Sequence, residues 1–119
     1  MQYLLLIFDD QDELAKLDAA ERARVLSDYL AFTDDIRRSG HFRSGNALEP
    51  VTTATTIRVR RGKRVMVDGA CCETREQLAG YYVVEAADLD EAITLAERLP
   101  STRFGAVEVR PVMRLRSTA

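Results

Sequence analysis

Hydrophobic residues form short runs and spaced stripes along the chain, and this pattern predicts alternating strands and helices. Residues 2–8 are apolar at nearly every position, which is typical of an interior strand covered on both faces. An acidic turn, Asp9-Asp10, follows it. Further strands are predicted by alternating or β-branched residues in segments 41–48, 55–60, 64–67, 80–86 and 104–112.

Two stretches predict amphipathic helices, each with its own start signal. Asp18, followed three residues later by Glu21, has the form of an N-cap with a capping box. Apolar residues then recur at helical spacing until Gly40 supplies a stop. Asp88 repeats the cap pattern before the second helix, which Pro100 ends.

Segments 55–60 and 64–67 flank the glycine-containing loop 61–63 and therefore predict a β-hairpin. We expect four of its apolar residues to face inward: Ile57, Val59, Val65 and Val67. The hairpin also holds the one basic cluster of the chain, Arg58, Arg60, Arg61, Lys63 and Arg64. We interpret these charges as protection of an exposed sheet edge, with RNA or phosphate binding as the alternative.

The order of elements predicts an α+β fold, a ferredoxin-like split βαβ sandwich with an added hairpin, as a single domain over residues 1–112 with a tail over 113–119. Two helices on one face leave the other face of the sheet uncovered. We expect that face to carry Leu4, Leu6, Tyr82 and Val84. Such an apolar patch favours a homodimer.

Composition narrows the functional classes. The 119 residues carry 17 basic and 19 acidic side chains, so the net charge of -2 gives no global attraction to nucleic acid or to an anionic membrane. With neither an apolar run long enough to span a bilayer nor the flanks of a signal peptide, we expect a cytoplasmic protein. Cys71 and Cys72 are adjacent and are expected as free thiols. With His41 as the single histidine, we expect no metal and no cofactor.

Several segments, taken in order, resemble one known family. They are the opening YLLLIF, the helix that ends near Gly40, the stretch TATTIRV, the motif DGACCETREQLAGYY and the final EVRP. Over residues 1–112 the chain looks like the DGPF-type branch of the YCII-related proteins. The resemblance implies a dimeric α+β barrel with no settled activity, and a sigma factor as a partner by family association only.

The chain departs from this family at two places. Ala70 and Cys71 stand where the family motif has Pro and Phe, which either widens the pocket or lets Cys71 occupy it. In the YCII branch a His and an Asp are thought to act together, and alignment puts Asp28 at the position of that His. The dyad is therefore not preserved here.

The loop that begins with Asp68 and Gly69 is our first candidate site. A turn explains both residues, since Asp bonds its own backbone and Gly accepts a positive φ. As a functional alternative, Asp68 and Glu73 act as acid and base around a ligand that also contacts Gly69 and Cys71. Cys71 is a small thiol in the simplest interpretation and a nucleophile if Arg75 lowers its pKa.

Two further side chains complete the candidates. His41 is expected as a partly exposed residue at a strand start, or as a lone general base reaching the pocket. Of Tyr81 and Tyr82, one must face each side of the strand, and we name Tyr82 as the ligand-binding residue.

Two functions compete. In the first, the protein binds a small molecule in a cavity between sheet and helices and has a regulatory role linked to sigma-factor transcription. In the second, it is a small-molecule enzyme that uses acid-base chemistry from Asp68, Glu73 and His41. We favour binding, because the relative's dyad is missing.

Overall fold

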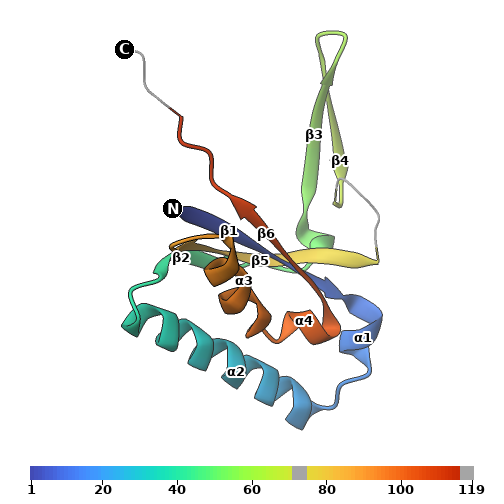
Figure 1. Ribbon diagram of the computed structural model, residues 1–119. Helices are drawn as coiled ribbons and strands as arrows, with labels where there is room; N and C mark the ends of the chain where they lie inside the picture. The colour runs from blue at the N-terminus through green and yellow to red at the C-terminus, as the bar shows by residue number, and fades with distance from the viewer. Residues whose placement is uncertain (71–74, 116–119) are drawn as a thin grey trace.

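The protein is described from a computed structural model, in which residues 1–70 and 75–115 are placed (Figure 1). Four strands form the main sheet: β1 (Gln2–Asp10), β2 (Phe42–Ala47), β5 (Glu76–Glu85) and β6 (Gly105–Pro111). Strands β3 (Thr55–Arg60) and β4 (Lys63–Asp68) form a separate hairpin. The helices are α1 (Gln11–Ala15), α2 (Ala19–Arg38), the short 3-10 turn η1 (Val51–Thr53), α3 (Leu89–Glu97) and α4 (Ser101–Phe104).

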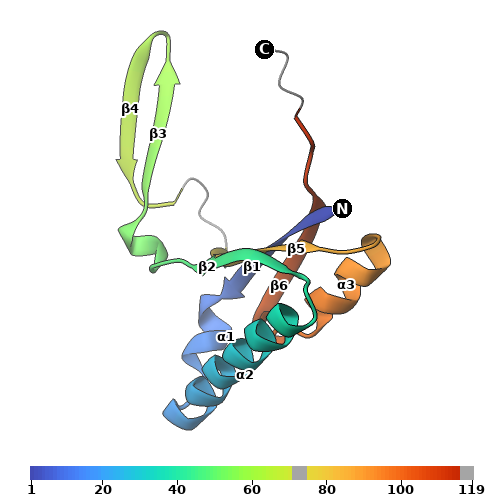
Figure 2. The ribbon, with the colours of Figure 1, turned by 90° about the vertical axis from the view of Figure 1, so that its left-hand side faces the viewer.

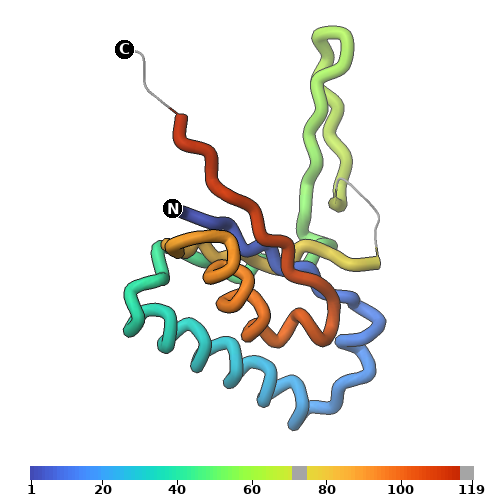
Figure 3. The backbone as a smooth tube through the Cα atoms, in the orientation of Figure 1, coloured from blue at the N-terminus to red at the C-terminus, as the bar shows by residue number. Residues whose placement is uncertain are grey.

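The main sheet has the strand order β2-β5-β1-β6, and each neighbouring pair is antiparallel. This order, with one helix after the first strand and another after the third, is that of a ferredoxin-like sandwich, and the β3-β4 hairpin is inserted between the second and third strands of the sheet. Helices α1, α2, α3 and α4 lie on one side of the sheet, while the turn η1 lies at the base of the hairpin (Figures 1, 2 and 3). The predicted α+β fold is therefore confirmed. None of the described helices is long and apolar enough to cross a membrane.

The core lies between the sheet and α2 and α3. Tyr3, Leu5 and Ile7 alternate along the helix-facing side of β1, and all three are buried. Phe32 and Ile36 of α2 lie one turn apart and are buried against them. The apolar stripe of α2 is thus divided: Phe32 and Ile36 lie in the core, while the apolar residues between Val25 and Leu30 are half-buried or exposed.

The predicted helix starts are confirmed by their side-chain bonds. The Asp18 carboxylate accepts from the Glu21 amide at 2.8 Å, and the Glu21 carboxylate accepts from the Asp18 amide at 3.3 Å, which completes a capping box. Asp88 accepts from the Glu91 amide at 2.9 Å at the start of α3. Gly40 has φ +81°, the left-handed conformation that follows a helix end.

Three boundaries differ from the prediction. Asp9 and Asp10 are not a turn: β1 continues through both, and the Asp10 carboxylate caps α1 by accepting from two amides. Strand β5 begins at Glu76 rather than at residue 80, because it stays paired with the extended end of β1. Helix α3 ends at Glu97, and Pro100 instead precedes the short helix α4.

The assignment of residues to the uncovered face was half wrong. Leu4 and Leu6 do point away from the helices, but Tyr82 and Val84 face them. The register decides this, because Tyr82 pairs with the buried Leu5, and Val84, which is itself buried, pairs with Tyr3 in the same manner. The open face carries Tyr81 and Val83 in their place, opposite Leu6 and Leu4.

The hairpin forms as predicted, but its apolar side chains do not face a core. The loop has two residues rather than three: Arg61 at φ 53° and Gly62 at φ 75° are both in the left-handed region, as a type I′ turn requires. Ile57, Val59, Val65 and Val67 are all exposed. The prediction that they face inward was wrong, because β3 and β4 pair only with each other and stand out from the body (Figures 1 and 2).

Candidate functional site

A pocket of about 290 Å³ lies between the middle of α2 and the helix-facing side of the sheet. Four polar side chains from three elements line it: Asp9 of β1, Tyr29 and Thr33 of α2, and Tyr82 of β5. We call it the tyrosine cavity. Its remaining lining is mostly apolar, from Ile7, Leu26, Leu30, Ala47, Ala79 and Gly80, together with Asn46, whose side-chain amide donates to the Tyr81 hydroxyl. A mainly apolar pocket with a few convergent polar groups is the usual form of a small-molecule site.

Tyr29, Ser101 and Asp9 form a chain of hydrogen bonds at one end of the cavity. Ser101, the first residue of α4, is only 2% exposed, and its Oγ donates to Asp9 Oδ1 at 2.6 Å. The Tyr29 hydroxyl bonds the same Oγ. Because Ser101 has a single hydroxyl proton and gives it to Asp9, Tyr29 must donate its own proton to Ser101. The chain is therefore directed from Tyr29 through Ser101 to the Asp9 carboxylate.

A second directed chain joins the two sides of the cavity. The Thr33 hydroxyl donates to the backbone carbonyl of Tyr29 at 2.9 Å. Tyr82 OH lies 2.6 Å from Thr33 Oγ1, so the Tyr82 proton is the one shared in this bond. Phe32 meets the Tyr82 ring edge to face, with centroids 5.3 Å apart, and fixes its plane. Both tyrosine protons are therefore directed into the protein.

What remains for a ligand is a set of acceptors. A phenol whose proton is already donated offers only oxygen lone pairs, and an ionised carboxylate such as that of Asp9 offers nothing else. Tyr29 and Tyr82 thus present acceptors from opposite walls, and Asp9 adds a negative one. The tyrosine cavity is built to receive hydrogen-bond donors.

Burial raises the pKa of Tyr29 to about 12, and the negative charge of Asp9 adds to the rise while the Ser101 hydrogen bond opposes it. Tyr29 therefore keeps its proton throughout the physiological range. Its role at neutral pH is to hold a hydrogen bond, not to act as a base.

Two glycines make room for this arrangement. A Cβ on Gly45 of β2 would lie 2.8 Å from Cδ1 of Tyr82, closer than real contacts allow. A Cβ on Gly80 would lie 2.9 Å from the carbonyl oxygen of Asn46, so glycine here lets β2 and β5 approach at the cavity floor. The sequence places glycine where the Tyr82 ring and the neighbouring strand need the space.

The cavity adjoins a wider groove of about 440 Å³ between α1 and α2, and the two share Asp9, Leu26 and Tyr29. Leu26 and Leu30 on α2 are 61% and 64% exposed, so an apolar rim surrounds the opening. A ligand can therefore reach Asp9 and Tyr29 from solvent through this groove.

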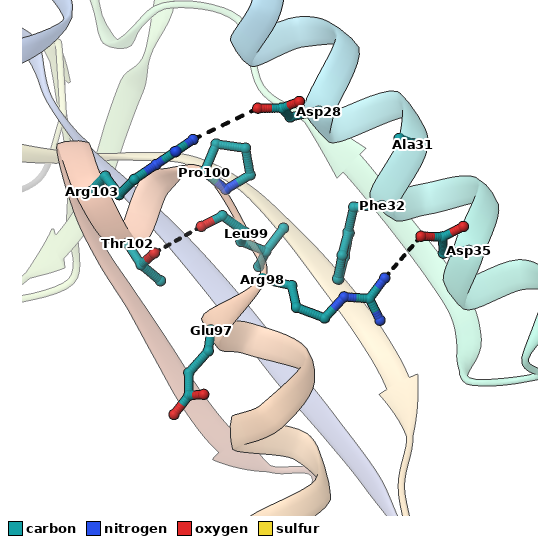
Figure 4. Close-up of a pocket in the computed structure, with 10 residues that line it drawn as sticks. All are labelled: Asp28, Ala31, Phe32, Asp35, Glu97, Arg98, Leu99, Pro100, Thr102 and Arg103. Carbon is teal, nitrogen blue, oxygen red and sulfur yellow. Dashed lines mark hydrogen bonds and ion pairs between the residues drawn. The ribbon is translucent and has the colours of Figure 1, made fainter.

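A third hollow, of about 430 Å³, lies between α2 and the α3-α4 connection (Figure 4). Its two cations are both paired: Arg98 reaches Asp35 at 3.0 Å, and Arg103 reaches Asp28 at 3.7 Å. The Arg98 guanidinium also stacks over Phe32 at 5.3 Å. Asp28, which the family resemblance aligns with a His of the YCII branch, thus belongs to this ion-paired groove and not to the tyrosine cavity.

His41 lies between α2 and β2 and joins α2 to α3. Its Nδ1 is 2.6 Å from Ser39 Oγ, and its Nε2 is 2.9 Å from Glu91 Oε1. Both ring nitrogens therefore have partners at the C-terminal end of α2 and the start of α3. His41 does not line the tyrosine cavity.

Asp68 and Gly69 lie at the base of the hairpin. Asp68 is the last residue of β4 and is exposed. Gly69 has φ +110°, the positive φ that the turn interpretation predicts, and its amide donates to the Ala54 carbonyl at 2.7 Å. Cys71 and Glu73 lie outside the described residues. The start of β2, beside His41, and the base of the hairpin lie at different ends of the sheet (Figures 1 and 2), so the structure does not bring His41 and Asp68 together.

Tyr82 is the sequence-predicted site residue that does line the cavity, while Asp9, Tyr29, Thr33 and Ser101 were missed as site residues. Asp9 and Ser101 are 92 positions apart, so no local motif joins them. One signal was available: a tyrosine within an otherwise apolar helix face needs a partner for its hydroxyl.

Comparison with known proteins supports the fold and the family. The YCII-related domain profile matches residues 1–116. An uncharacterized protein of Rhizobium meliloti (strain 1021) is 35% identical over 116 residues, covering 94% of this chain and 92% of its own. Among solved structures, 5-chloro-2-hydroxyhydroquinone dehydrochlorinase from Burkholderia phenoliruptrix AC1100, in complex with 2,5-dihydroxybenzoquinone, has a TM-score of 0.55 at 19% identity and covers 95% of this chain and 94% of its own. At that identity the likeness concerns the fold.

Proposed function

The chain belongs to the YCII-related family, and on that premise we propose that it binds a small, hydroxylated ring compound in the tyrosine cavity. The observation that carries the proposal is the direction of the two hydrogen-bond chains. The hydroxyl groups of Tyr29 and Tyr82 both donate their hydrogen bonds to other protein side chains. The cavity therefore offers hydrogen-bond acceptors to a ligand that carries hydrogen-bond donors.

Size and polarity support the same ligand class. A pocket of about 290 Å³ lies just below the range of ~300–1,000 Å³ that is usual for small-molecule sites, so it suits a single ring rather than a nucleotide. Its apolar lining suits the faces of the ring, and its acceptors suit hydroxyl groups on the rim. The dehydrochlorinase that shares the fold is described in complex with a dihydroxylated ring, which is compatible with this class.

Binding is favoured over the acid-base alternative that uses Asp68, Glu73 and His41. Tyr29 is held protonated, and both nitrogens of His41 are engaged with Ser39 and Glu91. The contacts of the described residues therefore do not support acid-base catalysis, which stays a prediction. A regulatory role and a sigma-factor partner likewise stay predictions that rest on family association. The cytoplasmic location, expected from the hydrophobic pattern of the sequence, also stays a prediction.

A pair of ring compounds tests the proposal. Hydroquinone carries two hydroxyl donors, and 1,4-dimethoxybenzene has the same ring without donors. We expect the wild-type protein to bind hydroquinone about 5- to 150-fold more tightly in a calorimetric titration, because each of two satisfied acceptors contributes roughly 0.5–1.5 kcal/mol.

The matched variants are Tyr82→Phe and Tyr81→Phe, on neighbouring residues of opposite faces. The Tyr81 hydroxyl accepts from Asn46 at 2.8 Å, and Tyr81 does not line the cavity. Tyr82→Phe should weaken hydroquinone binding about 3- to 10-fold, and Tyr81→Phe should leave it unchanged. Equal binding of the two ring compounds, or equal effects of the two variants, would overturn the proposal.

We also propose that the protein is a homodimer formed through the open face of the sheet. Leu4, Leu6, Tyr81 and Val83 lie side by side there, on the face that no helix covers. Covering this face with a second copy is the simplest way to remove its apolar surface from water. Light scattering should give twice the chain mass of 13.4 kDa. A mass of one chain at micromolar concentration would contradict the dimer.

A further inference from the structure

The β3-β4 hairpin has exposed apolar residues on both of its faces and no core of its own. Strand β4 is exposed at every position. An isolated two-stranded hairpin is marginally stable in water, and it needs a further strand or a packing surface to hold it. The described part of the chain gives it neither, since β3 and β4 form a separate two-stranded sheet.

The two faces of the hairpin are not equivalent. On the first face Ile57 pairs with Met66 and Val59 pairs with Arg64, so Ile57, Val59 and Met66 form one apolar stripe. These three residues are 59%, 63% and 53% exposed. On the second face Arg58 lies opposite Val65 and Arg60 lies opposite Lys63, so cationic side chains adjoin its two valines. The first face is therefore the more apolar contact surface.

The position of the hairpin indicates what covers it. It projects from the sheet on the side opposite α2, which is the side of the uncovered face (Figures 1 and 2). The radius of gyration, 16.6 Å, exceeds the roughly 13.5 Å of a compact chain of this length, as an extended arm would make it. A second copy of the chain that packs on the open face of the sheet would therefore lie next to the hairpin.

We propose that the hairpin is an arm that clasps the second copy of the chain through the stripe of Ile57, Val59 and Met66. The stripe presents roughly 300 Å² of surface, within the range of the largest patch on a typical monomer. Two arms and the matching surface on each partner would bury roughly 1,200 Å², the lower limit of a specific interface, before the sheet faces are added. The inference rests on the proposed dimer and is independent of the ligand.

The test changes one face of the arm at a time. In the first variant Ile57, Val59 and Met66 are replaced by Thr, and in the control Val65 and Val67 on the other face are replaced by Thr. Threonine keeps the preference for a strand while it removes apolar surface. By sedimentation equilibrium, the first variant should raise the dimer dissociation constant at least about tenfold, and the control should raise it less than about threefold.

A second measurement needs no variant. Hydrogen exchange of the wild-type amides in β3 and β4 should slow as the protein is concentrated into the dimer. Unprotected amides in a dimeric sample, or equal effects of the two variants, would overturn the arm and leave the sheet-face dimer standing. A wild-type chain that stays monomeric would overturn both, while ligand binding by the cavity would be unaffected.

Discussion

Replacing Ser101 by Ala isolates the hydrogen-bond chain on which the tyrosine cavity depends. Ser101 is 2% exposed, and its Oγ serves both the Asp9 carboxylate at 2.6 Å and the Tyr29 hydroxyl. Removing it abolishes one neutral bond of about 1 kcal/mol and one bond to a charged group of about 1.5–3 kcal/mol. Asp9 and Tyr29 also line the adjoining groove, so we expect solvent to offset part of this loss.

We therefore expect Ser101→Ala to lower the free energy of unfolding by about 2–3 kcal/mol, which in a domain of this size lowers Tm by roughly 8–12 °C. Thermal unfolding followed by circular dichroism measures it. The matched control is Thr102→Ala in the same short helix, where the Thr102 hydroxyl donates only to the Leu99 carbonyl, at 2.9 Å. Its effect should stay below about 1 kcal/mol.

A double-mutant cycle with Tyr29→Phe tests the coupling directly. Because Tyr29 and Ser101 share a bond, the effect of Ser101→Ala should shrink by about 1 kcal/mol when Tyr29 is already Phe. The reasoning is refuted if Ser101→Ala destabilises the protein no more than Thr102→Ala, or if the two substitutions add without coupling.

Four further predictions follow from other contacts in the structure. Burial holds the pKa of Tyr29 at about 12, above the usual value near 10, so stability should be full below pH 10 and fall between pH 10 and 12; Tyr29→Phe should flatten that fall in denaturant titrations. Asp9→Asn removes a negative charge and should lower the Tyr29 pKa in an absorbance titration, and a pKa unchanged or raised would contradict the assigned cause. Gly45→Ala brings a Cβ against the Tyr82 ring and should lower stability by about 1–3 kcal/mol and weaken hydroquinone binding; an unchanged affinity would show that the ring position is unimportant. His41→Ala removes the link to α3 and should lower stability by about 1 kcal/mol without changing hydroquinone affinity in calorimetry; a lost affinity would place His41 in the site.

The sequence predicted those structural features that depend on hydrogen bonds between residues close together in the chain. The capping box of Asp18 and Glu21 was visible because both partners lie within four residues. The face on which each strand residue lies depends on the register between paired strands, and no local pattern in the sequence gives that register. The two-residue turn at Arg61 and Gly62 pairs Ile57 with Met66. As a result Ile57 and Val59 lie on one face of the hairpin and Val65 and Val67 on the other, although all four were predicted to face inward.

The site was harder to predict than the fold, because its groups meet only in three dimensions. Asp9 was interpreted as part of a turn, yet it continues β1 and accepts from Ser101, 92 positions away. Tyr29 was grouped with packing residues, since helical spacing does not show where a hydroxyl finds its partner. Tyr82 was named as a ligand contact because one of two adjacent tyrosines must face the helices, which is a property of any strand.

The most direct test of the account is a map of backbone amide shifts as hydroquinone is added to the protein. The tyrosine cavity predicts that the signals of Ala79, Gly80 and Tyr82 on β5 move first and saturate together, while those of Arg98 and Arg103 in the ion-paired groove stay in place. Shifts confined to the ion-paired groove, or no saturable shift at any of these positions, would contradict the claim that the tyrosine cavity is the ligand site.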